Sequence, residues 1–173
     1  MAEYFKLYAA PEDTLKAWQR ALNLLGLEKK TRAFKRVATQ FDKTNDAALA
    51  NITDLVVNVT AGRTYVFRAV LFVTADAIGG HKYAISGTAV VASVAYQINS
   101  ISNATNAFVV NSRQTSLSGS AGQAGATVAY TEITGSIYVT GTGTLTVQFA
   151  QDVATPATTS SVLVGSMFIV EEA

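Results

Sequence analysis

The chain has 173 residues, enough for one sizeable core with or without an appendage, and 49% of them are apolar, which argues against a disordered chain. It has no cysteine and one histidine, which excludes disulfides, thiol chemistry and cysteine-based zinc sites. The net charge is +1, with 9 Lys/Arg and 5 Asp/Glu in residues 1–43 (net +4) and 4 Lys/Arg and 7 Asp/Glu in residues 44–173 (net −3).

The second segment is poor in charge, because globular domains average about a quarter charged residues. Its surface must therefore consist mainly of Ser, Thr, Asn, Gln, Gly and Ala. Such a surface is typical of a protein that packs against its own copies or works outside a cell. The first residues, Met-Ala-Glu-Tyr-Phe-Lys, lack a signal peptide's pattern, and no apolar run reaches the ~18 residues of a membrane helix. We expect synthesis in a cytoplasm, without export and without membrane insertion.

The N-terminal residues predict an arm followed by an amphipathic helix. Within residues 1–10, the apolar side chains of Tyr4, Phe5, Leu7 and Tyr8 either dock on a partner or fold back on their own domain. Pro11 to Thr14 favours a helix start. One apolar stripe then follows at spacings of three and four, ending near Gly26: Leu15, Trp18, Ala21, Leu22 and Leu25. This helix either packs on the domain that follows or anchors the chain to a neighbouring subunit.

A basic segment follows the predicted helix. It contains Lys29, Lys30, Arg32, Lys35 and Arg36. Clustered cations contact acidic protein surfaces or nucleic acid, but solvated linkers have the same composition. Because Phe34 is the only aromatic residue among them, binding of nucleic acid is the least favoured of the three interpretations.

From Arg36 onward the hydrophobic period changes from 3.6 to 2, which predicts strands. The eight expected strand segments are Arg36–Phe41, Leu49–Thr60, Thr64–Ala75, Lys82–Ile101 with a break at Gly87, Ala107–Arg113, Ala126–Thr140, Gly143–Gln151 and Val162–Val170. Ser116–Gly125 is expected to be a flexible loop. Thr64–Ala75 is apolar on both faces apart from Arg68, which indicates that both faces are covered. In an antiparallel sandwich the second cover is often another subunit.

The inventory of reactive residues argues against an enzyme. His81 follows a Gly-Gly pair and is expected in an exposed loop, and no Gly-x-Ser-x-Gly elbow presents a serine. The acids of the strand region are well separated along the chain: Asp46, Asp54, Asp76, Glu132 and Asp152. A hydrolase with paired carboxylates remains a remote alternative. The sequence has no phosphate-binding or metal-binding motif, so we expect no cofactor and no metal.

A sugar-binding site is a stronger alternative. Tyr96, Tyr130 and Tyr138 could stack on sugars, next to the amides of Asn99, Asn103, Asn106 and Gln123. Tyrosine in strands is more often a core or interface residue. A glycan-binding protein would place exposed aromatics near Ile78–His81 or Ser116–Gly125.

Two stretches carry a resemblance to a family. Val59-Thr-Ala-Gly-Arg-Thr-Tyr-Val-Phe-Arg-Ala-Val-Leu-Phe-Val and Gly79-Gly-His-Lys-Tyr-Ala-Ile-Ser-Gly-Thr-Ala are similar to jelly-roll domains of tailed-bacteriophage virion proteins. The end of the chain, Gly143–Gln151 and Leu163–Val170, is similar too. The resemblance covers roughly residues 52–170 and implies the heads of fibres or head-decoration proteins, which commonly trimerise. Residues 1–43 lie outside it.

We therefore expect a mainly β protein: an N-terminal arm and helix over 1–43, then an antiparallel jelly-roll-like β-sandwich of about eight strands over 44–173. The expected function is a non-enzymatic structural component of a phage virion. The apolar stripe and the basic segment would dock on the major capsid protein or another virion protein. The sandwich would form a homotrimer through aromatics such as Tyr65, Phe67, Tyr138 and Phe149. The alternative is a fibre head that binds a receptor or a host surface glycan.

Overall fold

The computed structural model describes residue 16, residues 31–128 and residues 130–173. The chain divides into two units, Met1–Thr31 and Arg32–Ala173. The helix expected over residues 11–25 lies outside the described residues, apart from Lys16. The second unit consists of strands, turns and loops, with no helix in residues 31–128 and 130–173.

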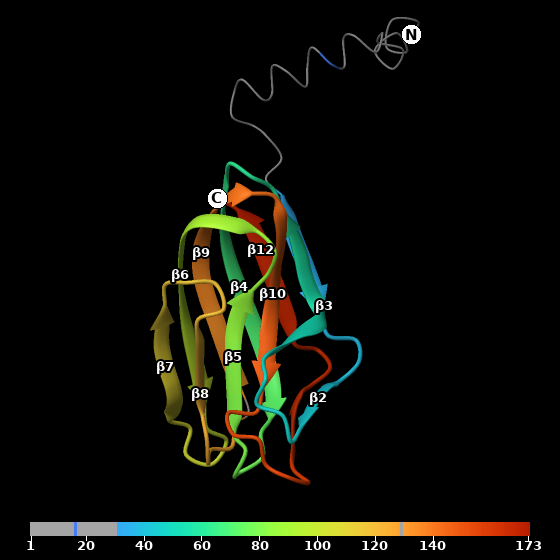
Figure 1. Cartoon of the computed structure of the whole chain (residues 1–173), viewed down its shortest axis with the longest axis vertical. Coiled ribbons are helices and arrows are strands. Elements are labelled where there is room, and N and C mark those ends of the chain that lie inside the picture. The colour runs from blue at the N-terminus through green and yellow to red at the C-terminus, as the bar shows by residue number, and fades with distance from the viewer. Residues whose placement is uncertain (1–15, 17–30, 129) are drawn as a thin grey trace, which may run out of the picture. The chain divides into compact units, whose positions relative to one another are not determined.

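The second unit contains antiparallel strands in a sheet of eight and a sheet of four. The strands are β1 (Arg32–Arg36), β2 (Phe41–Thr44), β3 (Ala50–Val59), β4 (Arg63–Thr74), β5 (His81–Ser86), β6 (Val90–Ile101), β7 (Phe108–Gln114), β8 (Ser120–Gln123), β9 (Tyr130–Gly141), β10 (Gly143–Ala150), β11 (Thr159–Val162) and β12 (Met167–Glu172). Figure 1 shows the two sheets face to face, with β3, β10, β5 and β8 in front.

Eight of the strands follow the order of a jelly roll, in which two Greek keys form facing sheets. The larger sheet contains the neighbours β1-β12-β4-β9, and the smaller sheet is β3-β10-β5-β8. The first strand thus pairs with the last, and the connections β3–β4, β4–β5, β8–β9 and β9–β10 each pass from one sheet to the other. The mainly β, antiparallel sandwich expected from the sequence is confirmed.

Four further strands lie outside this jelly-roll order. The hairpin β6–β7 is inserted between β5 and β8 and extends the larger sheet beyond β9. The short strands β2 and β11 pair with each other, and β11 also pairs with β4. The expected strand Lys82–Ile101 is two strands, β5 and β6, which separate at Gly87 as the break there predicts. Gly87 has φ +148°, and a Cβ on it would lie 1.9 Å from the carbonyl oxygen of Thr144.

Three sequence predictions need correction. The sandwich begins at Arg32 and not after residue 43, because β1 pairs with β12 over five residues and β2 pairs with β11 over four. The strand expected at Arg36–Phe41 is not continuous: Arg36 ends β1, Phe41 begins β2, and residues 37–40 connect them. The expected flexible loop Ser116–Gly125 contains β8, which pairs with β5 from Ser120 to Gln123. The small residues of β8 show no hydrophobic alternation, so the sequence pattern does not predict this strand. Pairing with β5 along one edge is enough to order it.

The core lies between the two sheets, where alternate residues of each strand meet. Tyr83, Tyr96, Phe149 and Phe168 are its largest fully buried side chains. The ring of Phe67 packs against Tyr96 and Phe168 at centroid distances of 6.1 Å each. Aromatic pairs at this distance stabilise the fold beyond the contribution of the apolar area that they bury. The cluster therefore stabilises the packing of three strands of the larger sheet.

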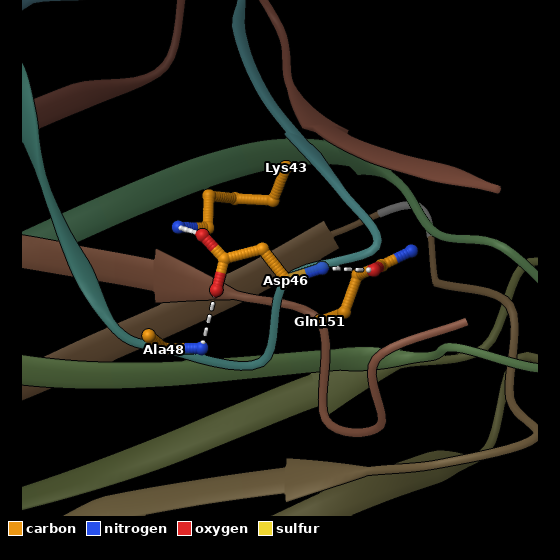
Figure 2. A network of polar contacts seen from close by, with 4 residues as sticks. All are labelled: Lys43, Asp46, Ala48 and Gln151. Carbon is orange, nitrogen blue, oxygen red and sulfur yellow. Dashed lines mark hydrogen bonds and ion pairs between the residues drawn. The ribbon is translucent and has the colours of Figure 1, made fainter. Parts of the chain in front are cut away.

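One end of the sandwich is closed by a polar network between two loops (Figure 2). Asp46, in the β2–β3 loop, accepts a hydrogen bond from Ala48 N at 2.8 Å and binds the ammonium group of Lys43. Gln151, in the β10–β11 loop, is fully buried, and its Oε1 accepts from Asp46 N at 3.0 Å. Its Nε2 donates to both the carbonyl and the hydroxyl oxygen of Thr158. The network thereby fixes the loops where strands of both sheets end.

Candidate interaction surface

The outer face of the larger sheet is defined by residues that alternate with core residues. On β4, Tyr65, Phe67 and Ala69 are buried, so the residues between them point away from the core. The pairing register then places outward residues of β1, β12 and β9 beside them. This outer face includes the apolar residues Phe34, Val66, Val70, Phe72, Tyr130, Tyr138, Met167 and Ile169.

Several apolar side chains on the outer face are exposed. The exposed fraction is 56% for Phe34, 43% for Val66, 42% for Phe72 and 40% for Tyr138. Phe72 and Tyr130 pack edge to face, with ring centroids 6.3 Å apart. Single exposed apolar residues are ordinary, but a group of them on one sheet face is typical of a contact surface.

The charges in the middle of the outer face neutralise one another. Arg68 on β4 binds Glu132 on β9, and this contact raises the pKa of the arginine above its ordinary value. Arg32 on β1 binds Glu171 on β12 at 2.7 Å. A depression of about 280 Å³ lies between these pairs, lined by Arg32, Val66, Phe67, Arg68, Ile169 and Glu171. The face therefore offers apolar contact with little net charge at its centre.

The predicted subunit contacts are only partly at this surface. Tyr138 lies on the outer face and is exposed. Tyr65, Phe67 and Phe149 are at most 4% exposed, because they point between the sheets. Their assignment to a subunit interface is corrected here: they belong to the core. The sequence pattern missed Phe34 and Phe72 as contact candidates, since alternation alone does not show which face of a strand is inside.

The predicted anchoring residues divide at the start of β1. Leu15, Trp18, Leu22, Leu25, Lys29 and Lys30 lie outside the described residues. Arg32, Lys35 and Arg36 are exposed residues of β1, which is an edge strand of the larger sheet. The structure therefore places three of the five cations of the basic segment in a strand and not in a solvated linker.

The tyrosines proposed for sugar binding are not grouped at a loop. Tyr96 is 2% exposed; its hydroxyl group donates to the carbonyl of Gly119 and accepts from Ile85 N at 3.3 Å. Tyr130 is half-buried against Phe72. Tyr130 and Tyr138 lie on the outer face already described, whereas Tyr96 belongs to the core.

His81 is buried and not in an exposed loop as the sequence suggested. It is the first residue of β5, its side chain is fully covered, and its ring lies 5.3 Å from that of Tyr83. Neither ring nitrogen has a hydrogen-bond partner among the residues that the structure describes. Burial lowers the pKa of His81 to about 4, so the imidazole is neutral near pH 7.

The acids considered for catalysis make separate contacts. Asp46 binds Lys43, Glu132 binds Arg68, and Asp54 accepts from Ala38 N at 2.8 Å. Asp76 accepts from the amides of Ile78 and Gly79, which lowers its pKa. Within residues 31–128 and 130–173 no group of three or more His, Asp or Glu side chains is placed to hold a metal ion. None of the described segments forms a helix long and apolar enough to span a membrane.

Comparison with known proteins finds weak structural similarities alone. No family model and no curated protein matches the chain. Among solved structures, the chain is similar to the VP2 subviral particle of infectious bursal disease virus, with 14% identity and a TM-score of 0.23. It is also similar to the structure of the Gt strain of that virus, with 10% identity and a TM-score of 0.24. Each match covers 84% of this chain and about 40% of the viral chain, 40% and 42% respectively. Likeness at this level says nothing of what this chain does.

Proposed function

We propose that the chain is a non-enzymatic structural component of a bacteriophage virion, a capsid-decoration or fibre-type protein whose sandwich binds further copies of itself. The observation that carries the proposal is the outer face, where Phe34, Val66, Phe72 and Tyr138 are all at least 40% exposed. The jelly-roll strand order and the resemblance of residues 52–170 to phage virion domains supply the context. Enzymatic activity is not part of the proposal, because the separated acids and the buried His81 suggest no catalytic pair.

A second copy of the same chain is the partner that the outer face fits best. Arg68 and Glu132 neutralise each other within the face, and so do Arg32 and Glu171. Another copy of the chain therefore meets little charge repulsion at this face, and apolar burial favours the contact. In a trimer the outer face of each copy contacts a different surface of the next copy. A partner of strongly positive or negative charge gains nothing at the centre of such a face. We propose a homotrimer, in keeping with the proteins that the sequence resembles.

The self-association is tested by mass in native solution. The wild-type chain should be a trimer at micromolar concentration, and Val66→Glu should yield monomers, because it buries an unpaired charge in the contact. Val153→Glu is the matched control: Val153 is 49% exposed in the β10–β11 loop, away from the sheet face. A wild-type chain that is monomeric at micromolar concentration would contradict the proposed self-association.

The virion role is tested on particles. Residues 1–30 and β1 would dock the protein on the major capsid protein or another virion protein, since they carry the apolar stripe and the cations. A variant without residues 1–30 keeps every described strand, so it can fold and still lose incorporation into particles. Incorporation unchanged by this deletion would contradict docking through residues 1–30, and electron microscopy would then show which surface is used.

A further inference from the structure

We propose that the free edge of β1 accepts an extended, acidic segment of another protein as an added strand. The description of that partner as a virion protein rests on the proposed function; the binding surface does not. The structure leaves β1 paired with β12 alone among the described strands. Its other edge is therefore a template for strand addition, a common mode of peptide recognition.

Charge determines what such an edge binds. β1 reads Arg-Ala-Phe-Lys-Arg, with three cations in five residues. Arg32 is bound to Glu171, but no acid of the described chain lies within ion-pair distance of Lys35 or Arg36. Arg32 and Arg36 project on the outer face, and Lys35 projects on the opposite side of the sheet. An added strand with acids would therefore meet a cation on either of its faces.

A second copy of this chain does not supply the acidic strand. The edge strands of the described sheets are β1, β2, β3, β7 and β8. β3 and β2 carry one acid each, and β7 and β8 carry none. Two copies of β1 would repel each other, which is the usual way in which cations protect an edge from pairing with itself. The same cations attract an acidic strand from a different protein.

Phe34 adds an apolar contact to this edge. Its side chain is 56% exposed between Arg32 and Arg36, and its neighbour across the pair with β12 is Ile169. A strand in which acids alternate with apolar residues could place an apolar side chain beside Phe34 while its backbone pairs with β1. Nucleic acid would use the cations without the backbone pairing, so hydrogen exchange separates the two ligands.

The test uses the whole chain and a labelled synthetic peptide of alternating Glu and Val, with an alternating Gln and Val peptide as reference. We expect the Glu peptide to bind and to slow amide hydrogen exchange in β1 but not in β7. Arg36→Glu should weaken binding at least about tenfold, because a repulsion replaces an attraction. Arg113→Glu, the same change on β7 at the opposite edge, should weaken it less than about twofold.

Three results would overturn the proposal: equal binding of the Glu and Gln peptides, equal effects of Arg36→Glu and Arg113→Glu, or exchange in β1 that the peptide does not slow. Tighter binding of single-stranded DNA without protection of β1 would assign the cations to nucleic acid instead. These measurements use the isolated protein and do not depend on a particle. Failure of the proposed function, seen as absence from virions, would therefore leave a positive result intact.

Discussion

Asp46 and Gln151 lie 105 positions apart in the chain and are joined by two hydrogen bonds, one donated by the backbone N–H of each residue. The Asp46 N–H donates to the side-chain Oε1 of Gln151 at 3.0 Å, and the Gln151 N–H donates to the carbonyl of Asp46 at 3.2 Å. The Gln151 side chain also donates to Thr158. One buried amide therefore satisfies groups in two loops.

Replacing Gln151 with alanine should lower the free energy of unfolding by about 2–4 kcal/mol, because buried backbone groups lose their partners. The matched control is Gln148→Ala. Gln148 is a neighbouring residue of β10 whose amide bonds only to Asn51, in an exposed setting, and we expect a loss below about 1 kcal/mol. Urea denaturation of both variants measures the difference, and equal losses would contradict the role given to the buried amide.

His81 should make the protein sensitive to mild acid. Its pKa is about 4 in the folded chain and 6.5 when unfolded, so the unfolded state binds the proton first as the pH falls. Above pH 6.5 protonation of His81 does not lower the free energy of unfolding. As the pH falls from 6.5 to 4, the free energy of unfolding decreases by about 3 kcal/mol in total, because the unfolded state takes up the proton more readily. The variant His81→Phe should lack this slope, which unfolding measured at several pH values would show. The carboxyls of Asp42, Asp46 and Asp76 have lowered pKa values and titrate below this window. A slope between pH 6.5 and 4 that is the same in wild type and variant would contradict the burial of His81.

Two glycines with similar backbone angles should respond differently to alanine. Gly62 has φ +78° and open space around it, whereas Gly80 has φ +63° and a Cβ there would lie 2.0 Å from the carbonyl oxygen of Gln123. Gly62→Ala should cost about 1 kcal/mol from backbone strain alone. Gly80→Ala should lower the free energy of unfolding by about 1–3 kcal/mol more than Gly62→Ala does, since the β8 backbone must move. Thermal denaturation of the two variants tests this prediction. Equal losses of stability would contradict it, because the β8 backbone would then accommodate the new Cβ without a measurable cost.

Phe149 and Tyr138 should separate folding from self-association. Phe149 is fully buried against Tyr83, so Phe149→Ala should destabilise the fold by about 3–5 kcal/mol. Tyr138→Ala should leave the stability of the subunit within about 1 kcal/mol and weaken the contact between subunits. Denaturation and sedimentation, measured on both variants, separate the two effects. A Tyr138→Ala protein that associates as tightly as wild type would remove Tyr138 from the contact.

The period of the hydrophobic residues was enough to predict most of the sandwich. Alternation on Leu55, Val57 and Val59 identifies β3, and alternation from Tyr65 to Val73 identifies the inner face of β4. The polar β8 was missed because its order comes from pairing with β5, which no local pattern records. β1 was missed because an edge strand rich in cations resembles a linker.

The surface was harder to predict than the core. The sequence gives β4 two apolar faces, and it does not say that Phe67 is covered by its own chain while Phe72 is not. Burial depends on which side the smaller sheet covers, a matter of tertiary packing. His81 was misplaced for the same reason: it follows Gly79 and Gly80, which suggest a loop, yet it is already the first residue of a covered strand.

The pairing of the first described strand with the last has a mechanical consequence. Arg32 opposes Glu171, so β1 begins beside the end of β12. Hydrogen bonds of an antiparallel pair run across the strands. A force that pulls the start of β1 away from the end of β12 would break these hydrogen bonds one after another. A force between the start of β1 and the loops at the opposite end of the sandwich would load them together in shear. The fold should therefore resist a pull along its length far better than a pull between its own ends.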